Sequence, residues 1–177
     1  LEQVLKSFGF EKGSATMHQT HSSDISFADS HETYECDGLY TDKKLLPLVV
    51  KTADCVPILM ESNKRISAIH AGWRGLEQLI FEKSLKLHDI SSLSISIGPH
   101  ARKCCYEVGV EFTKKFKNSI DIVENKYYLD LTKNIKNFAF KNNINLEDTG
   151  ECTICNKKYF SYRENRTNER QFSFIWI

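Results

Sequence analysis

The sequence lacks a long hydrophobic run and lacks a strong net charge. No apolar stretch approaches the roughly 20 residues that span a bilayer, so no membrane segment is predicted. The 24 lysine and arginine residues nearly balance 23 aspartate and glutamate residues, which leaves a net charge of +1. Such a balance gives no electrostatic footprint for nucleic acid or for an anionic membrane. No signal peptide is visible, although the chain begins at Leu1, and we expect a cytoplasmic protein.

The sequence also lacks the cysteine pattern of a disulfide-stabilised protein. Its six cysteines comprise two isolated residues, one adjacent pair and one C-x-x-C pair: Cys36, Cys55, Cys104, Cys105, Cys152 and Cys155. This spacing favours reduced thiols in a reducing compartment. The C-x-x-C pair resembles half of a zinc ribbon, but no second pair at a suitable spacing accompanies it. Cys105 is interpreted as a buried structural thiol, with a role in lining a site as the alternative.

The chain is long enough for one domain with a substantial core. It has 177 residues, of which 41% are hydrophobic, and it shows no internal repeat, no low-complexity tract and no linker. Apolar periodicity predicts strands at residues 17–25, 45–50, 56–60, 65–71, 93–97 and 172–177, and helices within 1–13 and at 76–87, 109–117 and 130–142. Because these elements do not alternate strictly, a doubly wound sheet is not expected. We predict a single mixed α/β domain over residues 1–177.

Three side chains that can bind a metal ion stand where predicted strands meet loops. They are His21 in QTHS, Cys55 in TADCVP and His70 in AIHAGWRG. Imidazole nitrogen and thiolate sulfur suit zinc, and three protein ligands with an open fourth position describe a catalytic zinc site. The intervals between these residues match no short zinc motif, so a buried structural cysteine and two hydrogen-bonded histidines are the alternative. His31 and His88 are interpreted as surface residues.

The residues next to these candidates extend the interpretation. Two glycines flank Trp73 and Arg74 directly before a predicted helix. Glycine lets the backbone approach a ligand closely, and a helix N-terminus with an arginine suits an anion. An ordinary turn with a solvated Arg74 is the alternative. Asp54 precedes Cys55 and could orient a ligand or act as a general base, or it could be a turn aspartate.

Taken together, TADCVPIL and IHAGWRGL resemble the YfiH-like family, which is also called the laccase-domain or polyphenol oxidase family and, more recently, purine nucleoside phosphorylase. The similarity extends to ECDGLYTD around Asp37, to IGP at 97–99, to CCYEVG at 104–109 and to FSYR at 160–163. It covers nearly the whole chain from Met17 onward, and the first two motifs in this order are specific.

The resemblance implies a layered α/β (α+β) sandwich with mixed β-sheets, similar to a bacterial toxin deamidase that uses cysteine and histidine. It implies zinc as the cofactor, bound by His21, Cys55 and His70. It also implies phosphorolysis of adenosine, inosine, guanosine and methylthioadenosine, together with hydrolytic deamination of adenosine. A purine nucleoside and phosphate are then the expected partners, and neither nucleic acid nor a membrane is expected.

Further residue roles are expected on the same basis. In deamination, Asp54 or a neighbouring group would move protons, and in phosphorolysis Arg74 would help to hold the phosphate that attacks C1′ of the ribose. Cys55, Asp54 and Arg74 are therefore the expected catalytic residues. Arg74, Tyr162 and Arg163 are expected to bind the substrate.

The sequence departs from the family pattern in three places. A T-x-R-x-G-G-V-S segment usually begins the family and is thought to help bind phosphate or substrate, but nothing before Met17 matches it. We therefore expect this chain to lack that segment, which leaves the phosphate site open. The family's GPCIGPCCYEVG is replaced by GPHARKCCYEVG, and the ending SYRENRTNER keeps only Arg163 and Arg170 of the usual SYRRDG-x-TGR.

Three other functions remain open on the sequence alone. A copper-dependent polyphenol oxidase (laccase) would need more histidine ligands than the six present, which include no H-x-H pair. A metal-free hydrolase or deamidase would use Cys55 as the nucleophile and His70 as the base. A partner-binding or metal-carrying domain without enzymatic activity is the third. The sequence does not indicate an oligomeric state.

Overall fold

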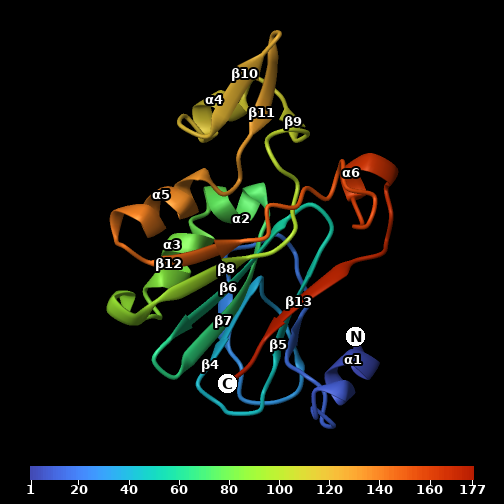
Figure 1. Ribbon diagram of the computed structural model, residues 1–177, viewed down its shortest axis with the longest axis vertical. Helices are drawn as coiled ribbons and strands as arrows, with labels where there is room; N and C mark the ends of the chain where they lie inside the picture. The colour runs from blue at the N-terminus through green and yellow to red at the C-terminus, as the bar shows by residue number, and fades with distance from the viewer.

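A six-stranded mixed sheet forms the centre of the protein in the computed structural model, which describes all residues 1–177 (Figure 1). Its strand order is β12-β8-β6-β7-β4-β2. The strands are β2 (Ile25–Phe27), β4 (Gly38–Thr41), β6 (Val56–Ser62), β7 (Arg65–Ala71), β8 (Ser94–Ile97) and β12 (Asn145–Asp148). Strands β4, β7, β6 and β8 pair antiparallel, whereas the edge strands β2 and β12 pair parallel to their neighbours. The mixed α/β fold predicted from the sequence is confirmed.

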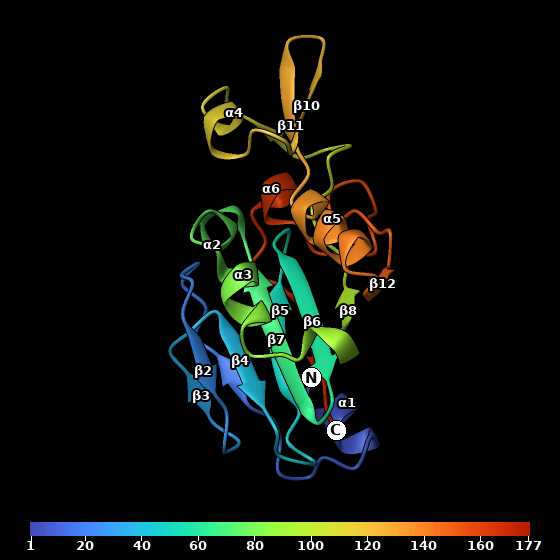
Figure 2. The ribbon, with the colours of Figure 1, turned by 90° about the vertical axis from the view of Figure 1, so that its left-hand side faces the viewer.

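Two further layers cover the faces of this sheet. The antiparallel pair of β5 (Leu48–Thr52) and β13 (Gln171–Ile175) packs on one face. The helices α3 (Ile80–Leu85) and α5 (Lys133–Lys141) pack on the other, where Figure 2 shows α3 in front of β7. The short parallel pair of β1 (Thr16–Met17) and β3 (Thr33–Tyr34) extends the first layer, and α1 (Glu2–Ser7) lies near both chain ends.

Strand β7 is buried on both of its faces, which explains its nearly continuous apolar sequence. Successive side chains of a strand point to opposite faces. Ile66 and Ala68 therefore enter the core shared with β5, whereas Ile69 and Ala71 enter the core shared with α3 and α5. Burial on both sides favours an apolar run over polar–apolar alternation. Ser67 and His70 are the buried polar residues in this run, and by the same alternation His70 faces the β5 side near the end of the strand.

A small substructure projects from the upper end of the molecule in Figure 1. It contains β9 (Glu107–Val108), α4 (Phe112–Lys115), β10 (Ile120–Val123) and β11 (Lys126–Leu129). Glu124 and Asn125 form the two-residue turn between β10 and β11, and both have positive φ, as a type I′ hairpin requires. None of the helices has the length and apolar character needed to cross a membrane.

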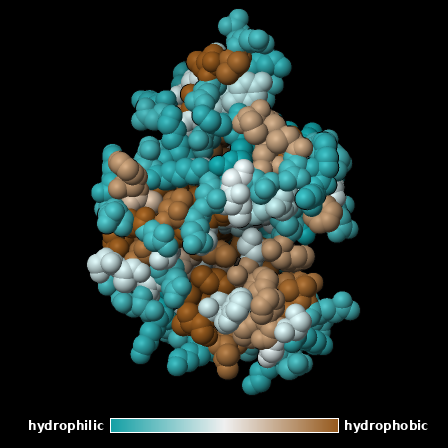
Figure 3. Space-filling view, viewed as in Figure 1, coloured by the Kyte–Doolittle hydropathy of each residue, from teal (hydrophilic) through white to brown (hydrophobic).

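The outer face of β5 and β13 carries apolar side chains. Figure 3 shows brown and tan residues gathered there. The rings of Phe8, Phe174 and Trp176 contact one another, with centroids 5.4 to 5.8 Å apart. This aromatic cluster joins α1 to the last strand, so the two ends of the chain stabilise each other.

The predicted helix at 76–87 is wrong in its extent. The structure instead has α2 (Trp73–Glu77) and α3, which are separated at Leu79, a residue with φ of 65°. A left-handed residue interrupts the helical hydrogen bonds, and this change of direction allows Ile80 and Phe81 to reach the core. The predicted helices at 109–117 and 130–142 are shorter in the structure, as α4 and α5.

The predicted strand at 17–25 forms only at its ends, in β1 and β2. The intervening residues turn back because the carboxylate of Asp37 accepts backbone N–H bonds from Thr20, His21 and Ser22. Backbone donors captured in this way cannot join a β-ladder. The alternating sequence of residues 17–25 therefore does not form a continuous strand, because a buried carboxylate 15 to 17 positions away binds its backbone donors.

His88 is buried, which corrects the interpretation of this residue as a surface histidine. Its two ring nitrogens lie 2.7 Å from Ser62 Oγ and 2.6 Å from Ser67 Oγ. Burial, together with the positive charge of Arg65, lowers the pKa of His88 to about 4. The ring is thus held neutral between two hydroxyl groups on neighbouring strands.

The stability of the protein is expected to depend on His88 between pH 6.5 and pH 4. Unfolded His88 takes up a proton below its ordinary pKa of about 6.5, whereas the folded residue does so only near pH 4. The unfolded state then binds more protons, so the free energy of unfolding falls as pH falls, by on the order of 2–3 kcal/mol across this window. Urea unfolding of His88→Gln at pH 7, 6 and 5 should show a shallower fall than wild type. Exposed His31 supplies the matched control, His31→Gln, and equal slopes for all three proteins would contradict the prediction.

Candidate functional site

His21, Cys55 and His70 meet at one end of the central sheet. Cys55 directly precedes β6 and His70 stands near the end of β7, and these strands pair antiparallel, with Val56 opposite Ala71. His21 comes from the loop between β1 and β2 and has φ of 64°. The ligand atoms of the three side chains all lie within 4.8 Å of one another. The structure thus brings together residues up to 49 positions apart, while their role as metal ligands stays a prediction.

Asp37 organises this group from a fully buried position at the start of β4. Its Oδ1 accepts hydrogen bonds from His70 Nδ1 at 2.7 Å and from the backbone N–H of His21 at 3.0 Å. Its Oδ2 accepts from Thr20 N–H at 3.1 Å and from both the N–H and the Oγ of Ser22 at 2.7 Å. Because an ionised carboxylate only accepts, His70 carries its proton on Nδ1 and presents Nε2 to the other ligand candidates.

No role was predicted for Asp37, although the residue lies in the family-like segment ECDGLYTD. The only local signal is an acidic residue directly before Gly38, where a short apolar strand begins. Burial of that carboxylate becomes visible only when the register of β4 against β7 is known. The backbone N–H of His70 donates to Asp37 O at 2.8 Å, which fixes this register beside the site.

The protonation of the three groups is coupled. Burial would raise the pKa of the Cys55 thiol, but the neighbouring His21 and His70 rings lower it to about 6. Burial would lower the pKa of His70, but the hydrogen bond to Asp37 and the neighbouring Cys55 raise it to about 9. Burial acts against ionisation of Asp37, yet the bonds from His70 and Ser22 hold the pKa of its carboxyl well below its usual range. A thiolate therefore faces a histidine whose Nδ1 is hydrogen-bonded to a carboxylate.

Gly72 leaves space for two of these side chains. A Cβ built on this residue would lie 2.9 Å from His21 Cδ2 and 3.0 Å from Cys55 Sγ. Its φ of −75° and ψ of 169° are open to any residue, so the requirement for glycine at this point is steric. The glycine that precedes Trp73 thus keeps the sulfur and an imidazole ring in place.

Gly72→Ala is expected to weaken metal binding without unfolding the protein. The added methyl group would displace the His21 ring and the Cys55 sulfur, and misplaced ligands typically lower metal affinity about tenfold or more. Competition with a chromophoric chelator would measure the affinity, and thermal unfolding of the metal-free protein would check the fold. Gly72→Ser adds further bulk and should lower the affinity at least as much. Unchanged affinity in both variants would show that the ligand candidates do not depend on this gap.

Asp54 links the site to two segments that are distant in the sequence. Its Oδ1 accepts from Thr153 Oγ1 at 2.7 Å, and its Oδ2 accepts from the backbone N–H of Arg163 at 2.6 Å. The residue has φ of 90° and is almost fully buried. Both carboxylate oxygens are therefore engaged, and Asp54 holds the loop around Thr153 and the start of α6 (Tyr162–Asn165) against the turn that carries Cys55.

An open pocket of about 610 Å³, within the range of small-molecule sites, begins at Trp73, the residue after Gly72; none of the three ligand candidates lines it. Eight residues line it: Trp73, Cys105, Tyr106, Glu107, Val108, Gly109, Phe112 and Arg163. Burial and the nearby charge of Cys55 raise the pKa of Tyr106, one of these lining residues, to about 12. The guanidinium of Arg163 lies 4.8 Å from the centre of the Tyr106 ring and donates to Glu107 O at 2.6 Å.

Of the residues expected to bind substrate, Arg163 lines this pocket, whereas Arg74 and Tyr162 do not. Arg74 is exposed in α2, and its guanidinium lies 5.1 Å from the centre of the Trp73 ring, at the rim. Tyr162 is exposed in α6 (Tyr162–Asn165) and does not line the pocket, although its neighbour Arg163 does. Cys105 is partly exposed and lines the pocket. This position corrects the interpretation of Cys105 as a buried structural thiol and agrees with the alternative, a thiol that lines a site.

Comparisons with known proteins identify the family of this chain. A family model described as multi-copper polyphenol oxidoreductase laccase matches residues 1–177. A purine nucleoside phosphorylase of Clostridium acetobutylicum is 38% identical over 176 residues, which cover 90% of this chain and 75% of that protein. A purine nucleoside phosphorylase of Aquifex aeolicus is 36% identical over 150 residues, covering 81% of this chain and 71% of that protein.

A solved structure shows the same fold. The hypothetical protein YfiH of Bacillus licheniformis superposes with a TM-score of 0.86, over 99% of this chain and 79% of that chain, at 24% sequence identity. The match of the family model to the whole chain, the two relatives above 30% identity and this structural likeness lead to one assignment. The chain belongs to the YfiH-like family, the laccase-domain proteins whose curated relatives include purine nucleoside phosphorylases.

Proposed function

We propose that the chain is a zinc-dependent purine nucleoside phosphorylase that acts on adenosine, inosine, guanosine and methylthioadenosine, and that it also deaminates adenosine. The observation that carries the proposal is the meeting of His21, Cys55 and His70 beside an open pocket lined with aromatic side chains and an arginine. The relatives that are named purine nucleoside phosphorylases support the reaction class. A purine nucleoside and phosphate are the proposed substrates.

The donor set fits zinc. Two imidazoles and one thiolate are ordinary zinc ligands, and three protein ligands leave one position for a reacting group. The buried Asp37 holds His70 in the orientation that metal-binding histidines usually have, with the inner nitrogen bonded to a carboxylate. A zinc ion bound here would supply Lewis-acid catalysis to the substrate.

The pocket beside these ligands suits a nucleoside and an anion. Trp73, Tyr106 and Phe112 offer aromatic surface on which a purine can stack, and the Trp73 and Phe112 rings lie edge to face with centroids 5.1 Å apart. Arg163 in the lining and Arg74 at the rim supply guanidinium groups, which match phosphate oxygens in planar pairs. We assign the phosphate to these two residues.

In phosphorolysis a phosphate oxygen forms a bond to C1′ of the ribose while the bond from C1′ to the purine nitrogen breaks. The electron pair of the broken bond goes to the purine, which takes up a proton, and ribose 1-phosphate is released. Arg163 and Arg74 would hold the attacking anion, and the aromatic side chains would orient the leaving base. Deamination would use water at C6 of adenine and release ammonia.

Asp54 has a positioning role in this scheme. Its carboxylate fixes the backbone of Arg163 and the hydroxyl of Thr153, so it sets where the guanidinium of Arg163 can reach. Tyr162 is the flanking residue of the same short helix, and its exposed ring lies 5.1 Å from the guanidinium of Arg166. We assign Tyr162 to the outer edge of the substrate site.

A metal-free hydrolase is the second candidate, and one observation favours it. The lowered pKa of Cys55 and the raised pKa of His70 describe a thiolate beside a protonated imidazole, as in cysteine hydrolases. Such an enzyme would keep its activity after thorough chelation and would lose it on alkylation of Cys55.

A multicopper oxidase finds less support in the arrangement of histidines. Only His21 and His70 approach each other closely in a metal-binding group. His18 pairs with Glu35 on the surface, His88 lies between two serines, and His100 hydrogen-bonds to the Gly98 carbonyl. A cluster of several copper ions would need these histidines in one place.

Phosphorolysis can be tested directly with the zinc-loaded protein. Adenosine, inosine, guanosine or methylthioadenosine is incubated with and without phosphate, and the products are separated by chromatography. We expect free base and the matching sugar 1-phosphate only with phosphate, and inosine from adenosine in either case. Cys55→Ala purified in parallel reports any phosphorylase carried over from the expression host. Absence of all these products from the wild-type protein would overturn the proposal.

A further inference from the structure

A second group of side chains that can bind a metal ion is separate from His21, Cys55 and His70. Cys104 and Cys105 stand between β8 and β9, and Cys152 and Cys155 stand between β12 and α6. Because β8 and β12 pair in parallel, with Ile97 opposite Asp148, both loops leave the same end of the sheet. The sequence indicated no partner for the C-x-x-C pair, since an adjacent pair has the wrong spacing for a zinc ribbon. The parallel pairing of β8 and β12 brings the adjacent pair Cys104 and Cys105 next to the C-x-x-C pair, which the sequence spacing did not predict.

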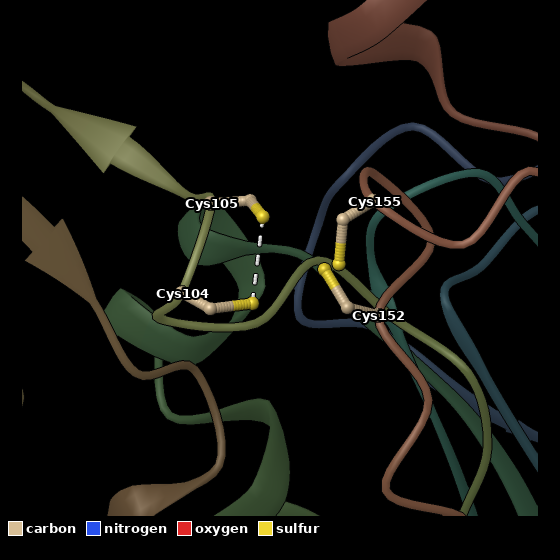
Figure 4. Close-up of side chains that lie close together, drawn as sticks. All are labelled: Cys104, Cys105, Cys152 and Cys155. Atoms are coloured by element: carbon tan, nitrogen blue, oxygen red, sulfur yellow. Dashed lines mark hydrogen bonds between the residues drawn. The ribbon is translucent and has the colours of Figure 1, made fainter.

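The four sulfur atoms converge. Figure 4 shows them pointing from the two loops into one shared space. All four lie within 4.8 Å of one another, and the Cys104 and Cys105 sulfurs are 3.4 Å apart. Four thiolates at about 2.3 Å from one zinc ion stand about 3.8 Å from each other in a tetrahedron. The observed spacing therefore comes within about 1 Å of that arrangement, a distance that small side-chain rotations can close.

We propose that Cys104, Cys105, Cys152 and Cys155 bind one structural zinc ion. Four cysteine ligands fill the tetrahedral coordination of zinc and leave no open position, which is the pattern of a structural site. An iron–sulfur cluster is a weaker match, because its inorganic sulfides and several iron atoms hold cysteine sulfurs farther apart than a single ion does. All four cysteines are free thiols here, as zinc binding requires.

The loops that present these sulfurs are held in place by other contacts. His100 and Cys152 form a parallel bridge, in which Thr153 N–H donates to His100 O at 3.1 Å and His100 N–H donates to Glu151 O at 3.3 Å. Arg102 forms a two-point ion pair with Asp148, at 2.8 and 2.9 Å. The backbones on both sides of the sulfur group are thus fixed before a metal binds, which lowers the entropic cost of forming the site.

The position of this group gives the zinc ion a specific structural effect. Cys105 is followed by Tyr106 and Glu107 of the pocket lining, and Cys152 is followed by Thr153, which bonds to Asp54. A zinc ion between the two loops would cross-link the segments that carry one wall of the pocket. Its removal should loosen this wall while the His21, Cys55 and His70 group, on the other strands, retains its own ligands.

Metal stoichiometry tests the proposal. Protein purified with zinc under reducing conditions, analysed by elemental mass spectrometry, is expected to hold two zinc ions per chain. The double variant Cys152→Ser/Cys155→Ser should hold one, Cys55→Ala should also hold one, and the combined variant should hold none. Cys36→Ala removes a thiol outside both groups and should keep two. The same zinc content in wild type and in Cys152→Ser/Cys155→Ser would overturn the proposal, as would iron with acid-labile sulfide.

A second measurement avoids dependence on variants that fold poorly. Cys104 and Cys155 are exposed, so without metal they should react quickly with a maleimide. Zinc should slow modification of all four cysteines at least tenfold in the native wild-type protein, as read by peptide mass spectrometry. Equal rates with zinc and with a chelator would overturn the proposal. So would a disulfide among these cysteines that persists in zinc-loaded protein.

Discussion

Cys55→Ala is expected to abolish phosphorolysis and to remove one metal ion per chain. The thiolate is the only anionic member of the group formed with His21 and His70, and two neutral imidazoles bind zinc far less tightly. Loss of Lewis-acid catalysis worth several kcal/mol corresponds to a fall of about 10³-fold or more in kcat/KM. Elemental analysis and the chromatographic assay would measure the two losses on the same preparation.

Loss of activity alone would not separate a metal ligand from a nucleophile, so a second substitution is needed. Cys55→Asp retains an anionic group that can bind zinc but cannot act as a thiol nucleophile. If Cys55 is a ligand, this variant should keep measurable zinc and part of the activity. Activity in chelated wild type, combined with an inert Cys55→Asp, would support the metal-free hydrolase instead. Cys36→Ala, a buried cysteine in the core beside β4, controls for the removal of a thiol.

The strands that carry the site were predictable from the sequence. Residues 65–71 form β7 as predicted, because a run buried on both faces keeps one apolar character from end to end. Residues 56–60 were predicted within β6 for the same reason. Once β6 and β7 pair antiparallel, the residue before the start of β6 and a residue near the end of β7 must lie close together. The sequence could therefore suggest that Cys55 and His70 meet.

The remaining parts of the site depend on contacts that have no local pattern. Asp37 is one buried carboxylate among many acidic residues, and only the register of β4 against β7 shows that it receives the His70 ring. The cysteine pairs are 48 positions apart and become neighbours through the parallel pairing of β8 and β12. Burial of His88 likewise requires two serines from different strands. Such features come from strand pairing, which periodicity cannot reveal.

Asp37→Ala is expected to destabilise the protein and to weaken metal binding at the same time. The substitution leaves the backbone N–H groups of Thr20, His21 and Ser22 without their acceptor in a partly buried position. Each unsatisfied donor costs about 1–3 kcal/mol, and breaking a buried charged pair with His70 typically costs about 3–5 kcal/mol in total. Urea unfolding in the presence of a chelator would measure this loss without a contribution from bound metal.

The metal affinity of an isosteric variant separates the two effects. Asp37→Asn keeps the shape of the side chain, but its amide nitrogen must face at least one donor that the carboxylate accepted. We expect a smaller loss of stability than for Asp37→Ala, together with a 10- to 100-fold loss of zinc affinity, because His70 loses the group that orients it. Asp24→Ala, which removes an exposed carboxylate from the same loop, should change the free energy of unfolding by less than about 0.5 kcal/mol. Wild-type zinc affinity in Asp37→Asn would mean that the loop and the His70 ring are held by their packing alone, and the carboxylate would then have no part in preparing the site.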